Sequence, residues 1–276
     1  MFLELEEYFR VQRLPHIWCP GCGHGLILKA FVMAMKELNI NKDKTVIVSG
    51  IGCSSRASGY LDFNTLHSTH GRALAFATGI KFANPDLNVF VIMGDGDATA
   101  IGGNHLIHAS RRNIDMTAII FNNNIYGMTG GQFSPLTSQG KFATTAPYGN
   151  MERSFDICNL AISAGATFVG RGTSYHVKLL KDLIIKAYQH KGFSLVEALS
   201  GCPTAYGRKN KLRTSAEMLK WQRNHAVFAS KSDKLSKEQM QDDFIIGELY
   251  SEEAPEYNDE YAKLLAKLNQ EGNKDA

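Results

Sequence analysis

The sequence predicts an α/β fold with a doubly wound, mostly parallel sheet. Short runs of apolar and β-branched residues alternate with longer stretches in which apolar residues recur at helical spacing. This alternation is typical of parallel strands that are buried beneath helices. Three of the runs are also followed by glycine-rich stretches, and ligands of such sheets bind at the carboxyl ends of the strands. We therefore expect a site at that edge of the sheet.

The expected elements follow in a regular order. Strands are predicted at 45–49, 88–93, 117–121, 167–170 and 194–198, in the runs TVIVS, NVFVIM, TAIIF, TFVG and SLVEA. Helices are predicted at 24–38, 71–83, 102–112, 154–164 and 174–189.

The character of the sequence changes after about residue 203, where it becomes polar and basic and then rich in Lys, Asp and Glu. We expect a main domain at 1–210 and a helical, polar C-terminal extension at 211–276. The segment 261–268, YAKLLAKL, has helical spacing. It suits either a surface helix or an arm that packs on a partner subunit.

The composition excludes some classes of protein. The 276 residues carry 30 Lys and Arg against 27 Asp and Glu, and this balance argues against a nucleic-acid-binding protein. No apolar run is long enough to span a membrane. The acidic start, MFLELEEYFR, does not have the pattern of a secretory signal. We expect a cytoplasmic protein.

The stretch MGDGDATAIGG brings a carboxylate to the end of a predicted strand. Asp95 lies between Gly94 and Gly96, and FNNNIYG places asparagines after the next strand. Carboxylate and amide oxygens are ligands that Mg²⁺ prefers, and Mg²⁺ completes its shell with water and phosphate. Glycines allow backbone N–H groups to approach a diphosphate closely, and a following helix offers its N-terminus to negative charge. Asp97, by contrast, is expected to cap that helix.

Five cysteines are present: Cys19, Cys22, Cys53, Cys158 and Cys202. The CxxC in WCPGC is compatible with a redox disulfide, half of a zinc site, half of an iron–sulfur site or a simple turn. An odd number of cysteines in a reducing compartment favours metal binding or catalysis over a disulfide framework.

Six stretches, in the same order, resemble the β subunit of 2-oxoacid:ferredoxin oxidoreductases, and most closely the type assigned to 2-oxoglutarate. They are WCPGCGHG, SGIGCSSR, HSTHGRALAFATGIKFANP, MGDGDATAIGGNH, NNNIYGMTGGQ and GCPTAYGRKN, within residues 15–225. The GDG followed by NN also resembles the signature of the wider group of enzymes with the thiamine-diphosphate-binding fold.

The resemblance implies thiamine diphosphate and Mg²⁺ as cofactors. Asp95, Asn123 and the carbonyl of Ile125 match the family's Mg²⁺ ligands, with Asn122 as a competing assignment. The implied cofactor-binding residues are Cys22, His24, Gly52, Cys53, Ser54, Gly94, Asp95, Gly96, Asp97, Asn123, Ile125, Gly127, Met128 and Thr129.

The resemblance also implies one [4Fe–4S] cluster, bound through Cys19, Cys22, Cys53 and Cys202. A Cys₄ zinc site fits the same residue types and stays an alternative. Cys158 lies on an apolar helical face and is expected to be a buried small residue.

Three basic residues are candidate catalytic groups: His70 and Arg72 could meet the substrate or the diphosphate, and Arg56 could meet a substrate carboxylate. His70 and Arg72 in THGR lead a predicted helix, and Arg56 follows Cys53. His24, after CPGC, could donate a hydrogen bond to a diphosphate. The alternative is a capping or exposed histidine for His24 and an exposed, solvated arginine for Arg56.

One expected group is absent. Thiamine enzymes use a glutamate against the aminopyrimidine, and no stretch matches that motif; Glu197 is available, but its context does not mark it for this role. In the resembled family an α-type subunit supplies the glutamate. We therefore expect a catalytic β subunit that is inactive alone. It would act within a hetero-oligomer that converts a 2-oxoacid and coenzyme A to acyl-CoA and CO₂ and transfers electrons to a ferredoxin-like subunit or to ferredoxin. Pyruvate or another 2-oxoacid as substrate, a non-oxidative thiamine enzyme, and a zinc-stabilised assembly subunit are the alternatives.

Overall fold

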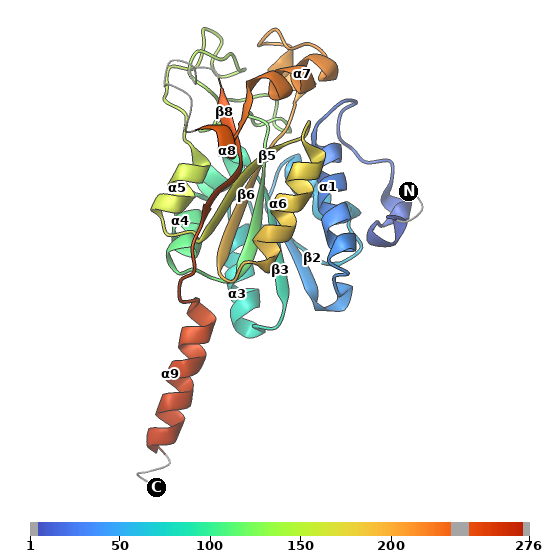
Figure 1. The fold of residues 1–276 in the computed structure, drawn as a ribbon. Coiled ribbons are helices and arrows are strands. Elements are labelled where there is room, and N and C mark those ends of the chain that lie inside the picture. The colour runs from blue at the N-terminus through green and yellow to red at the C-terminus, as the bar shows by residue number, and fades with distance from the viewer. Residues whose placement is uncertain (1–4, 233–242, 273–276) are drawn as a thin grey trace.

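The computed structural model describes residues 5–232 and 243–272 (Figure 1). Its strands are β1 (Thr45–Ser49), β2 (Asn64–His67), β3 (Asn88–Gly94), β4 (Met116–Asn122), β5 (Phe168–Thr173), β6 (Phe193–Leu199), β7 (Ala226–Phe228) and β8 (Phe244–Ser251). Its α-helices are α1 (His24–Glu37), α2 (Ala57–Tyr60), α3 (Ala73–Ala83), α4 (Gly103–Arg111), α5 (Ile157–Ser163), α6 (Val177–Gln189), α7 (Ser215–His225), α8 (Ala229–Ser232) and α9 (Tyr257–Gly272).

The strands form one eight-stranded sheet in the order β2-β1-β3-β4-β6-β5-β8-β7. Every pairing from β2 to β5 is parallel, β8 runs antiparallel to β5, and β7 is parallel to β8. The central strands β3 and β4 are apolar along nearly their whole length and buried on both faces. This is the pattern of parallel strands covered on two sides, and the predicted fold class is confirmed.

Alternate residues of the central strands supply two separate cores. Phe90 and Ile92 of β3 face a core shared with α1 and α6, whereas Val91 and Met93 face a core shared with α3, α4 and α5. Figure 1 shows these helices flanking the sheet. Because side chains of a strand alternate between its faces, one apolar strand can serve both layers.

All five predicted strands and all five predicted helices are present, with ends that differ by a few residues. Three strands were not predicted. β2, with the sequence NTLH, is half-exposed and polar, and β7 has only three residues. β8 lies within the extension expected at 211–276 and adds an antiparallel strand to the main sheet through its pairing with β5.

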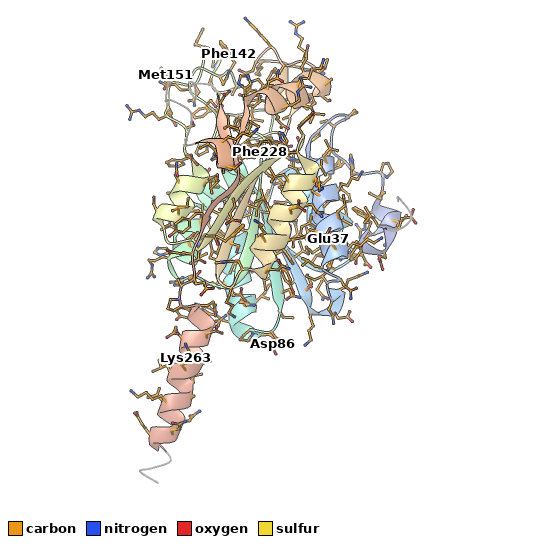
Figure 2. All side chains as sticks on the ribbon, in the orientation of Figure 1. Glu37, Asp86, Phe142, Met151, Phe228 and Lys263 are labelled. Carbon is orange, nitrogen blue, oxygen red and sulfur yellow. The ribbon has the colours of Figure 1, made fainter. Side chains whose placement is uncertain are left out.

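The C-terminal extension also contains the short strand β7 and the helices α7, α8 and α9. The segment 261–268 lies in α9, which projects from the body of the molecule and carries Lys263 (Figures 1 and 2). Residues 233–242 and 273–276 of the extension lie outside the described residues. Among the helices of the described ranges, none combines the length and the apolar character that a membrane crossing requires.

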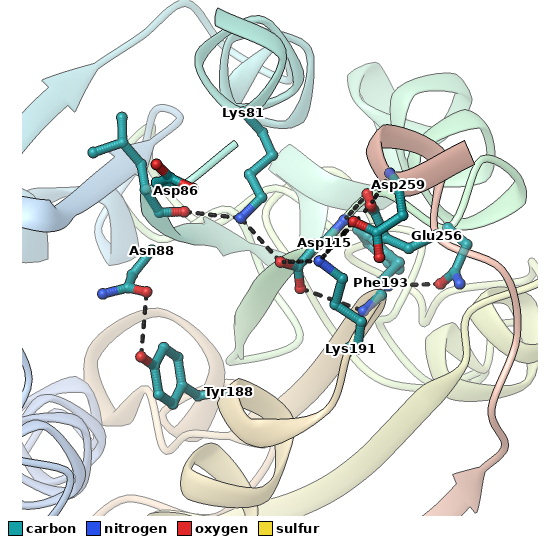
Figure 3. Close-up of polar contacts among 12 residues, drawn as sticks. Lys81, Asp86, Asn88, Asp115, Tyr188, Lys191, Phe193, Glu256 and Asp259 are labelled. Carbon is teal, nitrogen blue, oxygen red and sulfur yellow. Dashed lines mark hydrogen bonds and ion pairs between the residues drawn. The ribbon is translucent and has the colours of Figure 1, made fainter. Parts of the chain in front are cut away.

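A network of paired charges closes the edge at which the strands begin (Figure 3). Lys81 Nζ lies 2.9 Å from Asp115 Oδ2, and Lys191 Nζ lies 3.5 Å from the same oxygen. The buried Glu256 accepts hydrogen bonds from the backbone N–H groups of Asp115 and Asp259, at 3.1 and 2.9 Å. The network thereby connects α3, β4, the start of β6 and the base of α9.

Candidate active site

The carboxyl ends of β1, β3 and β4 surround a cavity of about 100 Å³. Its walls come from the three glycine-rich stretches that the sequence placed at this edge. All of the predicted cofactor residues except Cys22 line it, and so does His70. The full lining is His24, Ile51, Gly52, Cys53, Ser54, His70, Gly94, Asp95, Gly96, Asp97, Phe121, Asn123, Ile125, Tyr126, Gly127, Met128 and Thr129.

Three oxygen atoms converge at one wall of this cavity. The side-chain oxygen of Asn123 lies 3.2 Å from Asp95 Oδ1 and 2.7 Å from the carbonyl oxygen of Ile125. A rotated Asn123 amide would donate hydrogen bonds to both partners. With the oxygen in place, three acceptors face one another, and a cation is what such a group attracts. These oxygens come from the three residues that the resemblance assigns to Mg²⁺.

The neighbouring Asn122 points in a different direction. Its Nδ2 donates to Glu197 Oε1 at 2.7 Å, and its Oδ1 accepts from the backbone N–H of Asn124 at 2.9 Å. Both ends of this amide are therefore occupied away from Asp95. Of the two asparagines that the sequence left open, Asn123 is the one at the converging oxygens.

Asp95 is a buried carboxyl group that no lysine or arginine of the described residues contacts. Ser134 Oγ donates a hydrogen bond to Asp95 Oδ2. Burial nevertheless raises the pKa of Asp95 to about 7, and the hydrogen bond from Ser134 offsets only part of that effect. A bound cation would stabilise the ionised form. Ser134, far from GDG in sequence, carried no signal that could have marked it.

Asp97 does not cap a helix, contrary to the expectation from its sequence position. Its Oδ1 accepts a hydrogen bond from the backbone N–H of Gly71 at 2.6 Å and another from His70 Nδ1. Its Oδ2 is buried without a partner. Burial raises the pKa of Asp97, while the contacts with Gly71 and His70 act against this rise. Through these hydrogen bonds, Asp97 holds the THGR segment at the cavity wall.

Two positions at this edge require glycine, because neighbouring side chains leave no room for a Cβ atom. A Cβ on Gly50 would lie 1.8 Å from Asp97 Oδ2, and a Cβ on Gly96 would lie 2.1 Å from the ring of Tyr126. The Tyr126 hydroxyl donates to the carbonyl of Gly96 at 3.1 Å. Tyr126 is a cavity residue that the sequence analysis missed, although its place in NNNIYG, beside assigned residues, could have indicated it.

The three cysteine-bearing segments meet beside the cavity. The indole N–H of Trp18 donates to the carbonyl of Cys53 at 2.6 Å, and the N–H of Gly23 donates to the carbonyl of Gly201 at 2.9 Å. A Cβ on Gly127 would lie 3.4 Å from Cys53 Sγ and 3.9 Å from Cys202 Sγ. The segments that carry the four predicted ligands are therefore brought together, and Cys53 also lines the cavity.

These thiols influence one another electrostatically. Burial raises the pKa of Cys22 to about 12, and the sulfurs of Cys202, Cys53 and Cys19 add to the rise. Burial likewise raises the pKa of Cys53 to about 11. Within the described residues, no three His, Cys, Asp or Glu side chains are close enough to hold a single metal ion. Cys158 is buried apart from this group, with its Sγ 3.3 Å from Glu197 Oε2.

His24 lies at the back of the cavity as a neutral imidazole. It is fully buried, and burial lowers its pKa to about 3. Its Nδ1 lies 2.9 Å from Ser200 Oγ, and its ring meets Phe121 and Trp18 edge to face. The group available at this position is therefore a hydrogen-bonding side chain without charge.

The two candidate catalytic arginines are not brought to the cavity. Arg72 Nη1 donates to the carbonyl of Ile101 at 3.0 Å, on the outer side of the THGR turn. Arg56 ends the short turn Ser54–Arg56 and lines a different cavity with Arg10, Arg13 and His67. Of the three predicted catalytic residues, the structure brings only His70 to this cavity.

A second and larger cavity, of about 390 Å³, lies at the ends of β4, β5 and β6. Its buried charges are already paired, because Arg171 Nε lies 2.5 Å from Glu197 Oε2 and Arg171 Nη2 lies 2.7 Å from Asp156 Oδ1. Glu197 lines this cavity and not the smaller one. It is therefore not placed to engage a cofactor beside Asp95.

Comparison with known proteins agrees with this geometry. The family described as thiamine pyrophosphate enzyme, C-terminal TPP binding domain, matches residues 50–198, which is over half of the chain. The 2-oxoglutarate synthase subunit KorB of Methanocaldococcus jannaschii is 52% identical over 96% of this chain and 98% of its own length. That of Archaeoglobus fulgidus is 59% identical over 74% of this chain and 76% of its own.

The chain belongs to the β subunits of 2-oxoacid:ferredoxin oxidoreductases. A solved structure of similar fold is a 2-oxoglutarate:ferredoxin oxidoreductase from Magnetococcus marinus with 2-oxoglutarate, coenzyme A and succinyl-CoA bound. It is 36% identical, has a TM-score of 0.86, and the match covers 96% of this chain and 90% of that one. The chain is thus an oxidoreductase subunit with a thiamine-diphosphate-binding domain, and its family membership implies other subunits.

Proposed function

We propose that this β subunit binds thiamine diphosphate, Mg²⁺ and one [4Fe–4S] cluster and acts in the oxidative decarboxylation of 2-oxoglutarate. Coenzyme A would accept the acyl group, and ferredoxin the electrons. The observation that carries the proposal is the position of Cys53, which lines the cofactor cavity. The sulfur of Cys53 and the sulfur of Cys202 both lie near Gly127. A redox centre would therefore adjoin the cofactor.

The Mg²⁺ assignment rests on the donor set. Asp95, Asn123 and the carbonyl of Ile125 offer three hard oxygens and leave positions for diphosphate and water. The raised pKa of Asp95 fits a buried carboxyl group that no lysine or arginine of the described residues contacts and that a bound cation would stabilise in its ionised form. Gly52, with φ of +120°, and the glycines around Asp95 keep the cavity wall free of side chains where a diphosphate would lie.

The cluster assignment rests on the meeting of the segments that carry Cys19, Cys22, Cys53 and Cys202. Four thiolates on one zinc ion would lie about 3.8 Å apart, from a Zn–S distance of roughly 2.3 Å in a tetrahedron. No such compact group occurs within residues 5–232 and 243–272. A [4Fe–4S] cluster spreads its ligands more widely, because each thiolate binds a different iron. When bound, thiamine diphosphate supplies an electron sink, and a cluster beside it supplies a one-electron outlet.

Residues of this chain would bind and orient these groups without completing the site. His70, fixed by Asp97, faces the cavity, and neutral His24 lies at its back. A cavity of about 100 Å³ is much smaller than the roughly 300–1,000 Å³ of sites that enclose ligands. This supports a site that a partner subunit of α type completes, with the missing glutamate. The unpaired thiols suit the reducing cytoplasm.

The substrate assignment follows the relatives. The proteins named 2-oxoglutarate synthase match nearly the whole chain, and the similar structure contains 2-oxoglutarate. The test is an assay of the complex with its partner subunits, in which 2-oxoglutarate, pyruvate and branched 2-oxoacids are compared for coenzyme A-dependent ferredoxin reduction. A preference for pyruvate would contradict the substrate, and full activity of the isolated chain would contradict the need for a partner.

The cluster has its own test, which uses two cysteines of different environment. Iron and acid-labile sulfide would be measured per chain in wild type and in the variants Cys53→Ser and Cys158→Ser, purified anaerobically. We expect about four irons and four sulfides, lost in Cys53→Ser and retained in Cys158→Ser. One zinc per chain and no sulfide would favour a structural metal and remove the electron-transfer part of the proposal.

A further inference from the structure

A chain of hydrogen-bonded polar side chains lies behind the converging oxygens and crosses three neighbouring strands. Glu197 of β6 is paired in register with Ile120 of β4 on one side and Arg171 of β5 on the other. Its carboxylate is buried and has different partners on its two oxygens. Oε1 accepts from Asn122 Nδ2 at 2.7 Å, whereas Oε2 accepts from Arg171 Nε at 2.5 Å and from Cys158 Sγ at 3.3 Å.

Asn122 transmits this contact to the turn that carries Asn123. Its Oδ1 accepts from the N–H of Asn124, a residue in the left-handed region with φ of +59°. The carbonyl of Asn124 in turn accepts from Thr137 Oγ1 at 2.6 Å. The turn is therefore fixed on both sides of Asn123, and Glu197 determines which end of the Asn122 amide faces it.

Stability alone is a weak explanation for this arrangement. Buried ion pairs often contribute little compared with well-packed apolar residues, because both charges must be desolvated. The pair of Arg171 and Glu197 instead fixes the orientation of the Glu197 carboxylate. The guanidinium takes one carboxylate oxygen, so the other is aimed at Asn122.

We propose that Glu197 is a positioning residue for the cation site: through Asn122 it holds the turn in which the Asn123 amide oxygen faces Asp95. This inference rests on the proposed Mg²⁺ site and adds a residue from outside the GDG and NN stretches. Arg171 orients Glu197 and has no contact with the site. Groups that orient metal ligands typically change metal affinity 10- to 100-fold when they are altered.

The variant Glu197→Gln is nearly the same size and tests the orientation directly. Arg171 offers only donors, so the oxygen of the new amide would face it and the nitrogen would face Asn122. Asn122 could then satisfy that nitrogen only by turning its own oxygen away from Asn124. We expect the apparent Kd of Mg²⁺ to rise at least roughly tenfold, measured by calorimetry on the complex with its partner subunits at saturating thiamine diphosphate.

A second change should reverse the effect. In Glu197→Gln with Asn122→Asp, the new carboxylate would accept from the Gln nitrogen with one oxygen and from the N–H of Asn124 with the other. Asn122→Asp alone places a carboxylate against Glu197 and should weaken Mg²⁺ binding. We therefore expect both single variants to bind Mg²⁺ more weakly than the double variant. Additive losses in the double variant would overturn the proposal.

Ser194→Ala is the matched control, because Ser194 is also buried in β6 and its hydroxyl has no partner. It should leave the Kd of Mg²⁺ unchanged. If Glu197→Gln lowers the melting temperature but binds Mg²⁺ like wild type, Glu197 is only structural and the proposal fails. Should Glu197→Gln not fold, Asn122→Ala tests the same link with the pair of Arg171 and Glu197 left intact, and an unchanged Kd would again overturn it. Mg²⁺-independent cofactor binding by wild type would instead remove the underlying site.

Discussion

The buried charges at the start of β3 and β4 and those at the end of β3 have opposite environments, although Arg171 and Glu197 of β5 and β6 form a buried pair elsewhere. At the edge where the strands begin, Lys81 is buried against Asp115, and Lys191 also approaches Asp115 and Glu256 (Figure 3). At the edge where the strands end, Asp95 and Asp97 are equally buried, but neither is paired with a lysine or an arginine of the described residues.

The difference separates charges that hold the fold together from charges that are ready for a ligand. A paired buried charge is satisfied in the folded chain, and removal of its partner costs stability. A buried carboxylate without a positive partner raises the free energy of the folded chain, and a bound cation removes this destabilisation. We therefore expect substitutions at the two edges to change stability with opposite signs.

The largest expected effect is at Asp95. Its folded pKa of about 7 lies above the unfolded value of about 3.9, so the folded chain retains a proton that the unfolded chain has lost between these values. Stability of the cation-free chain should therefore fall as pH rises from about 4 to 7, by up to about 4 kcal/mol from this group.

Asp95→Asn removes that titration. Its amide can accept from Ser134 and donate to Asn123, so the variant should be more stable than wild type at pH 7.5 without Mg²⁺. The margin should shrink as the pH approaches 4. Thermal unfolding of both proteins across this range measures it, and a margin that is constant with pH would contradict the role of Asp95 ionisation.

Lys81→Met should have the opposite sign. Its side chain is 6% exposed and lies 2.9 Å from both Asp115 Oδ2 and the carbonyl of Leu87. Because Asp115 keeps Lys191 as a weaker partner, we expect a loss of about 2–3 kcal/mol, at or just below the usual cost of a broken buried pair. Urea unfolding gives this value. Thiamine diphosphate affinity should stay within about twofold, and a larger loss of affinity would mean that the two edges are coupled.

Glycine substitutions provide a smaller comparison of the same kind. Gly50→Ala would place a methyl group 1.8 Å from Oδ2 of Asp97, whose carboxylate Gly71 and His70 hold through Oδ1, so both stability and cofactor affinity should fall. Overpacking of this kind costs about 1–3 kcal/mol. Gly79, exposed within α3, has no atom near the corresponding position.

Gly79→Ala should therefore stabilise the chain by up to about 1 kcal/mol, through helix propensity, with no change in cofactor affinity. Melting temperatures and calorimetric titrations of the two variants give the comparison. Equal effects of the two substitutions would show that Gly50 is not held against Asp97.

Much of this account could be predicted from the sequence because the informative signals are local. Apolar strands that are buried on both faces, such as β3 and β4, are recognisable on their own, and GDG and NN follow them directly. β2 lies at the edge of the sheet and β8 lies between β5 and β7. Both were missed because half-exposed strands lack a continuous apolar run, and what makes them strands is pairing with distant residues.

The finer features of the site depend on three-dimensional contacts between distant segments. Ser134 reaches Asp95 across 39 positions, and Asn122 is distinguished from Asn123 only by Glu197, 75 positions away. Arg72 follows His70 closely in sequence, yet its side chain bonds to Ile101 on the outer side of the turn. Spacing predicts which loops meet, whereas the direction of each side chain requires the structure.

The most direct test of the contrast between the two edges is a titration of thiamine diphosphate into the complex of this subunit with its partners, with and without Mg²⁺, for wild type and Asp95→Asn. We expect wild type to bind tightly only with Mg²⁺, and Asp95→Asn to lose at least about 100-fold in affinity although it is the more stable protein without cation. Equal affinities of the two proteins, or tight binding by wild type without a divalent cation, would contradict the account.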